Sequence, residues 1–224
     1  NTGRWSHWSA PVEFTASGAD NTQALLDALR ITEINYNPHT PNAAEYTAGF
    51  TDDSMFEFVE LRNTGNAVLD LNRVELSGGI SFRFADSAVH HLAPGQYAVV
   101  VGNQAAFEAR YGNTIQVAGP FGGKLSNQGE HIRLSAAPGV VIEEFTYHDT
   151  GNWPGRARGK GSSLELSDPG GLPSVEPQRT QYLEDGDNWR ASQEYGGSPG
   201  RAGIGPVQDV MINEVLSHTE PPGK

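Results

Sequence analysis

The chain has 224 residues, 27 acidic against 15 basic side chains, a formal net charge of −12 and no cysteine. The absence of cysteine excludes disulfides, thiolate metal sites and thiol nucleophiles. Because nucleic acids are held mainly by Lys and Arg, the acidic balance makes nucleic acid an unfavoured partner. The sequence has no run of about eighteen apolar residues, so no membrane insertion is expected.

Glycine and proline, with 27 and 14 residues, recur between short apolar runs. This pattern is typical of many short strands joined by turns. The length fits one sizeable all-β domain with flanking pieces. Residues 1–19 alternate aromatic and polar side chains and are interpreted as the C-terminal strand of a preceding sandwich domain. Residues 20–30 are expected to be a linker with a short helix, and residues 31–206 the main domain.

Strands are predicted, in chain order, at residues 31–36, 55–63, 68–71, 73–76, 80–84, 97–101, 115–117, 131–134, 140–147 and 162–166. The pattern of apolar residues shifts its phase between the predicted strands 68–71 and 73–76, which indicates a bulge. The run 97–101 is the most continuously apolar and is expected to be central. A short helix is predicted at 104–111, between a capping Asn103 and Gly112.

The segment 58–63 alternates strictly: Val59 and Leu61 share one face, and Glu60 and Arg62 share the other. Such alternation predicts one buried and one wet face. Glu60 and Arg62 are accordingly expected to form cross-strand pairs on the surface.

Residues 168–206 are rich in glycine and proline, and their aromatic residues Tyr182 and Trp189 indicate loops packed around the sandwich. The segment Ile212–Val215 repeats the pattern of Ile31–Ile34, and each is followed by His-Thr and a proline. Residues 207–224 are therefore interpreted as the start of a second, truncated copy of the same domain.

A set of motifs, in this order and at these spacings, resembles the lamin tail domain. The motifs lie at residues 58–63, 69–71, 92–97 and 125–134, with closing elements at 161–166 and 188–192. Over roughly residues 30–201, the resemblance implies an immunoglobulin-like antiparallel β-sandwich with short helices and long loops. It also implies a place among other sandwich domains in large bacterial proteins that are secreted or displayed on the cell surface. No catalytic residues are established for this family, so none is carried over.

Four acidic residues are the candidate metal ligands: Glu33, Asp52, Asp53 and Glu57. Calcium would need six to eight oxygens, some of them from carbonyls in the loop 39–54. The spacing matches no calcium-binding loop, and the alternative is a set of solvated surface acids. No cofactor is expected unless these acids bind calcium.

One basic stretch follows a tryptophan in a predicted loop: Trp153, Arg156, Arg158 and Lys160. Cationic side chains beside an aromatic face suit a polyanion or a carbohydrate. The alternative is a tryptophan in the core and arginines paired with nearby carboxylates.

Three functions remain open. The first is a non-catalytic structural, adhesion or protein-interaction module, whose partners are neighbouring domains of a parent chain, other proteins or surface glycans. The second is a carbohydrate- or polyanion-binding module that uses the Trp153–Lys160 loop, assisted or not by calcium. An enzyme is the third and least favoured, because no serine sits in a Gly-x-Ser-x-Gly elbow or beside a recognisable base motif.

Overall fold

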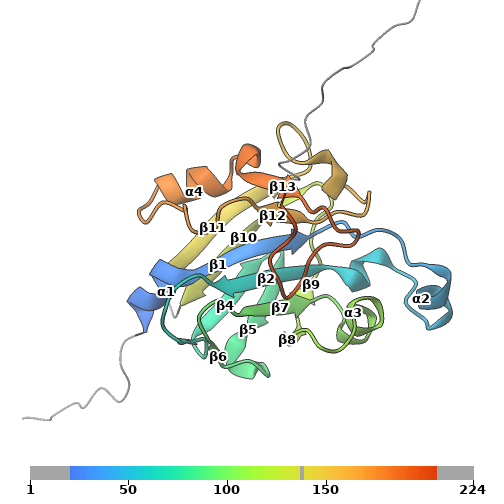
Figure 1. Cartoon of the computed structure of the whole chain (residues 1–224), viewed down its shortest axis with the longest axis horizontal. Coiled ribbons are helices and arrows are strands. Elements are labelled where there is room, and N and C mark those ends of the chain that lie inside the picture. The colour runs from blue at the N-terminus through green and yellow to red at the C-terminus, as the bar shows by residue number, and fades with distance from the viewer. Residues whose placement is uncertain (1–20, 137–138, 206–224) are drawn as a thin grey trace, which may run out of the picture.

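The computed structural model describes residues 21–136 and 139–205 (Figure 1). The interpretations of residues 1–19 and 207–224 fall outside this range. The described part is an all-β sandwich with short helices and long loops, as expected. Its longest helix, α3 (Gln104–Tyr111), has eight residues and is far too short to cross a bilayer.

Two sheets make up the sandwich, and a two-stranded ribbon accompanies them. The six-stranded sheet has the order β13 (Trp189–Ala191), β12 (Leu164–Leu166), β1 (Leu29–Asn35), β2 (Phe58–Asn63), β7 (Tyr97–Val101) and β8 (Val117–Pro120). The five-stranded sheet has the order β11 (Val141–His148), β10 (Gly129–Ala136), β4 (Val74–Gly78), β5 (Ile80–Arg83) and β9 (Gly122–Gly123). The ribbon pairs β3 (Leu69–Asp70) with β6 (His91–Leu92).

Short helices join these strands. The α-helices besides α3 are α1 (Thr22–Ala28), α2 (Ala43–Thr47) and α4 (Gln178–Leu183). The 3-10 turns are η1 (Asp53–Phe56), η2 (Phe84–Asp86), η3 (Gly155–Ala157) and η4 (Gly186–Asn188). Residues 21–30, interpreted from sequence as a linker, form α1 and the start of β1, and Leu25 and Ala28 pack into the core.

The main core lies between the two sheets, where Ile31 and Leu61 of one sheet share an apolar cluster with Leu76 and Ile132 of the other. The alternation read from the sequence is the physical origin of this arrangement, because every second side chain of a strand points to the same face. Trp189 is buried in the same cluster. The loop-rich segment after residue 168 therefore packs on the sandwich, as predicted.

A smaller apolar cluster lies on the opposite face of the six-stranded sheet, where Phe58, Val99 and Val101 meet Phe107 of α3. Strand β7 is thus buried on both faces, which explains its continuous apolar run. The helix α3 begins at Asn103, whose side chain accepts from the Ala106 amide, as predicted. Because α3 carries the chain over the sheet, β8 joins β7 in parallel, the one such pair among the described strands.

The shift of apolar phase after residue 71, which was predicted to be a bulge, is instead the point where the chain passes from the ribbon to the five-stranded sheet. β3 pairs with β6 in the ribbon, whereas β4 pairs with β10 and β5 in the five-stranded sheet. A bulge does occur in β1, where the register with β2 shifts between Ile31 and Glu33. The inserted residue lets Thr32 and Glu33 both approach Glu60 on the outer face.

A buried ion pair ties β1 to β11 across the sandwich. Glu143 Oε2 accepts the Ile31 amide at 2.9 Å, and Glu143 Oε1 lies 3.7 Å from Arg30 Nε. The Arg30 guanidinium also donates to three backbone carbonyls at the end of α1. Burial raises the pKa of Glu143 to about 7, and the charge of Arg30 opposes that rise. Both side chains are almost fully excluded from water, so each depends on the other.

We expect Glu143→Ala to lower the free energy of unfolding by about 3 kcal/mol, because it strands the Ile31 amide and the Arg30 charge in the interior. Urea unfolding measures this loss. The matched control is Glu75→Ala, which removes a half-exposed partner of Arg83 and should cost about 0.5 kcal/mol. A loss at Glu143 as small as that of the control contradicts the assignment.

Candidate functional site

Three glutamates lie side by side on the outer face of the six-stranded sheet, away from the main core. Glu33 of β1 is in register with Glu60 of β2 on one side and with Glu165 of β12 on the other. All three are at most 4% exposed. Like charges directly opposite each other on neighbouring strands repel. Such a row is therefore stable only if protons or hydrogen-bond donors compensate the charge.

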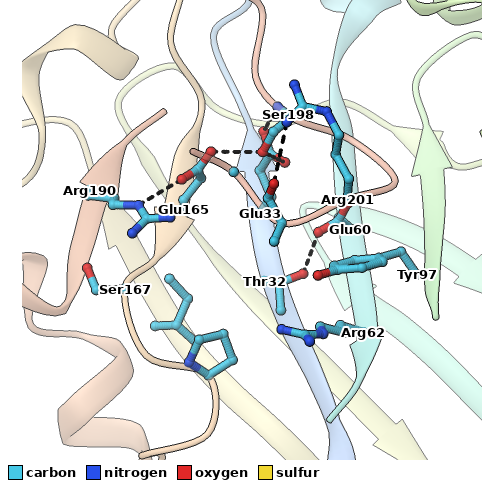
Figure 2. A pocket seen from close by; sticks show the side chains of 14 residues that line it. Thr32, Glu33, Glu60, Arg62, Tyr97, Glu165, Ser167, Arg190, Ser198 and Arg201 are labelled. Atoms are coloured by element: carbon cyan, nitrogen blue, oxygen red, sulfur yellow. Dashed lines mark hydrogen bonds and ion pairs between the residues drawn. The ribbon is translucent and has the colours of Figure 1, made fainter. Parts of the chain in front are cut away.

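Several of the compensating donors come from a segment that crosses this face, residues 193–205, which we call the strap (Figure 1). The Ser198 amide donates to Glu33 Oε1 at 2.8 Å, and the Gly200 amide donates to Glu60 Oε2 at 2.6 Å. Ser198 Oγ lies 3.2 Å from Glu33 Oε2 and 2.8 Å from Glu165 Oε1 (Figure 2). Each glutamate of the row is thus bound by the strap.

Gly197 is required where the strap approaches the sheet most closely. Its φ of +97° is disfavoured for residues with a side chain. A Cβ at this position would also overlap Glu33 Oε1 and reach Ser163 Oγ at 3.0 Å. The backbone can therefore contact the carboxyl row only as glycine.

Burial raises the pKa of Glu33 and of Glu60, and the neighbouring carboxyls add to the rise, so the neutral forms of both side chains are favoured. Ser198 Oγ is within hydrogen-bonding distance of both Glu33 Oε2 and Glu165 Oε1, and its single proton can be donated to only one of them at a time. Glu165 Oε2 in turn accepts from Arg190 Nε at 2.8 Å. Raised pKa values at Glu33 and Glu60, together with the Arg190 guanidinium beside Glu165, therefore reduce the repulsion within the row.

A cavity of about 170 Å³ opens beside this row. Arg62 and Tyr97 lie on one side of it and Arg190 and Ser167 on the other (Figure 2). The Arg62 guanidinium lies over the Tyr97 ring, 5.1 Å from its centroid. Arginine and tyrosine donors around a partly enclosed space are the elements of a polar binding site.

The prediction that this face of β2 is exposed to water is therefore wrong at Glu60, which is 1% exposed. Glu60 and Arg62 also form no ion pair, because Thr32 Oγ1 and the Gly200 amide occupy the two carboxyl oxygens. No local signal in 58–63 predicts this, since the covering chain lies 140 residues further along.

The four candidate calcium ligands do not form one group. Glu33 belongs to the carboxyl row, whereas Asp52 is exposed and caps η1 by accepting from the Ser54 amide. Glu57 is buried, accepts from the Leu125 amide at 2.8 Å, and has a pKa that burial raises to about 8. Its other oxygen has no partner among the described residues. Asp53, in η1, is close enough to Glu57 to raise this pKa further. Among residues 21–136 and 139–205, no group of three or more acidic or histidine side chains is placed to hold a metal ion.

The residues of the predicted ligand-binding loop, Trp153–Lys160, also have different environments in the structure. Trp153 is 6% exposed and stacks on Trp189, with 6.0 Å between ring centroids. Arg158 pairs with Asp149 at 3.1 Å. Arg156 and Lys160 remain exposed.

An exposed aromatic ring that the sequence analysis missed lies next to this loop. Tyr195 of the strap is 72% exposed, stacks on His39 with 4.4 Å between centroids, and covers Gly161. Its place beside Lys160 depends on the path of the strap, so no sequence motif could have identified it.

A family model described as Lamin Tail Domain matches residues 22–149, more than half of the chain. Among solved structures, the chain is similar to the crystal structure of a DUF4876 family protein from Bacteroides thetaiotaomicron, with a TM-score of 0.47 and 12% identity. That alignment covers 85% of this chain and 75% of the other. No curated protein matches the sequence.

Because the pKa values of Glu33 and Glu60 are raised in the folded protein, we expect its stability to fall as pH rises. The folded-state pKa values of Glu33 and Glu60 lie above the ordinary value of 4.5, so their stabilisation is complete below about pH 4.5 and is lost as pH rises through the folded-state pKa. Each group contributes a slope of up to about 1.4 kcal/mol per pH unit in that window. Glu60→Gln, which mimics the protonated acid, should flatten the slope and be more stable than the parent at pH 8.

Urea unfolding of the parent, Glu33→Gln and Glu60→Gln between pH 5 and 9 measures these slopes. Glu75→Gln, at a half-exposed position, is the control and should leave the slope unchanged. If Glu60→Gln is less stable than the parent at pH 8, Glu60 is ionised and the proton assignment fails.

Proposed function

We propose that this chain, which belongs to the lamin tail domain family, is a non-catalytic structural, adhesion or protein-interaction module. We further propose that it is part of a larger bacterial protein that is secreted or displayed on the cell surface. Immunoglobulin-like modules of this family are generally without catalytic activity. A function of this kind requires a rigid body with loops available to partners, and it requires no reactive centre.

The observation that carries the proposal is the closure of the six-stranded sheet on both faces. The main core covers one face, and α3 with the strap covers the other. Strap residues Ser198 and Gly200 bind the sheet through buried hydrogen bonds. Such closure favours a stiff module, because an opening would expose buried carboxyls as well as apolar surface.

The chemistry of the cavity also supports a binding role over a catalytic one. No histidine lines it in the described part of the chain. Ser198 of the strap is buried against the sheet and bound to two carboxyls, so its hydroxyl is not presented to a substrate. A hydrolase of the serine type needs an accessible nucleophile with a base in reach.

The placement of the two ends of the described part supports a role in spacing other domains. The described chain starts at α1 and ends near β13, well apart in the molecule (Figure 1). A module of this kind separates whatever precedes it from whatever follows it.

Surface labelling tests the proposed location. We expect an antibody against this chain to label intact cells of the producing bacterium, and external protease to remove the label. A cytoplasmic protein labelled in parallel controls for lysis. Labelling that requires permeabilised cells contradicts the proposal.

Carbohydrate or polyanion binding is kept as a second candidate because the exposed Tyr195 ring lies at Gly161, directly after the loop that carries Arg156 and Lys160. An aromatic face complements the C–H face of a sugar, and the two cations suit sulfate or carboxylate substituents. This surface replaces Trp153, whose ring is buried, as the stacking element.

Heparin chromatography at two salt concentrations tests the second candidate. Retention should fall at the higher salt, because it depends on screened charges. It should be lost in Arg156→Ala with Lys160→Ala and kept in the control Arg73→Ala, which removes an exposed arginine of the turn before β4. Equal retention of both variants contradicts binding by this loop.

A further inference from the structure

Arg62 is the one guanidinium of the cavity that has no acidic partner among the described residues. Arg190 pairs with Glu165 at 2.8 Å, and Arg201 pairs with Glu194 at 2.7 Å. The Arg62 guanidinium lies over the Tyr97 ring, and its Nε is buried without an acceptor among the described residues. A buried donor left unpaired costs free energy, so its presence needs a reason other than stability.

The nearest carboxyl on the same strand forms no ion pair with Arg62. Glu60 lies two residues earlier on the same face, but its oxygens accept from Thr32 Oγ1 at 2.6 Å and from the Gly200 amide at 2.6 Å. The strap thus occupies Glu60 and leaves the positive charge of Arg62 uncompensated. Burial, the largest cause, also raises the pKa of Glu60, which favours its neutral form.

The other free groups of the cavity are also donors. The hydroxyls of Tyr97 and Ser167 line it and have no hydrogen-bond partner within the described residues. In Figure 2 the Tyr97 hydroxyl points toward the centre of the site, and Arg62 extends beneath it. Unpaired donors around one guanidinium select a ligand that accepts hydrogen bonds and carries negative charge.

The dimensions of the cavity limit the size of that ligand. Its volume of about 170 Å³ is below the ~300–1,000 Å³ of typical small-molecule sites. Leu166, Pro169 and Ala202 supply carbon surface along the wall. The space suits one planar anionic group on a short apolar stem.

We propose that this cavity binds the carboxylate of a partner protein, presented by a Glu or Asp side chain. Arg62 would donate two parallel N–H groups to the two carboxylate oxygens, and Tyr97 would add a third donor. The choice of a protein as the source of the carboxylate rests on the proposed interaction function. The carboxylate chemistry itself rests only on the cavity.

Titration of the full chain by two-dimensional NMR tests the proposal with a matched pair of probes. N-acetylglutamate methylamide should give saturable shifts at the amides around Arg62 and Tyr97, and the corresponding glutamine probe should bind at least about tenfold more weakly. Arg62→Gln should reduce binding of the glutamate probe by at least about tenfold, and Tyr97→Phe by a smaller factor. Arg73→Gln, at an exposed arginine outside the cavity, should bind as the parent does.

Arg62→Gln should fold normally, because the side chain loses no hydrogen bond or ion pair to the described residues. Its melting temperature should stay within about 3 °C of the parent. A larger fall would assign Arg62 a structural role and would overturn the proposal, and Tyr97→Phe then tests the cavity independently.

Three further results overturn the inference: no saturable shifts, equal binding of both probes, or unchanged binding in Arg62→Gln. Glucuronate that saturates the cavity when the glutamate probe does not would overturn the protein partner in favour of an acidic sugar. These outcomes are independent of the cell-labelling experiment. A module absent from the cell surface can still bind the carboxylate, and a displayed module can fail to bind it.

Discussion

The outer face of the sandwich depends on how three adjacent glutamates are neutralised. Glu60, Glu33 and Glu165 lie in register on neighbouring strands, where three ionised carboxylates would repel one another. Raised pKa values at Glu33 and Glu60, the Arg190 charge beside Glu165 and two amides of the strap together reduce that repulsion. The strap therefore closes the sheet through polar contacts, where a β-sandwich more often leaves a wet face.

A buried carboxyl is also compensated by nearby donors at a second polar contact, between the two sheets. The Glu143 carboxyl accepts the Ile31 amide and faces Arg30, so it connects the five-stranded sheet to the strand that carries Glu33. Buried polar groups of this kind tolerate few alternative packings, because any other register would leave them unpaired. Strand β1 is thereby positioned from both faces.

The closure has a functional consequence at Arg62. By occupying Glu60, the strap leaves one guanidinium without an acidic partner beside a small cavity. The rigidity that suits a structural module and the unpaired donors that suit recognition then have a common origin. A ligand that meets a preformed site of this kind loses less entropy on binding than one that must order a loop.

The sequence by itself determined the sandwich, the longer strands, the helix after Asn103 and the family, because side-chain alternation and capping residues act locally. It missed the short strands β6, β9 and β13, and the predicted strand 55–63 begins as the 3-10 turn η1. Only the tertiary structure decided which faces are wet. Glu60 is buried by chain 140 residues away, and Trp153 is buried against Trp189. Alternation fixes the side of the sheet to which a residue points, whereas its exposure depends on segments that are distant in sequence and reach it only after folding.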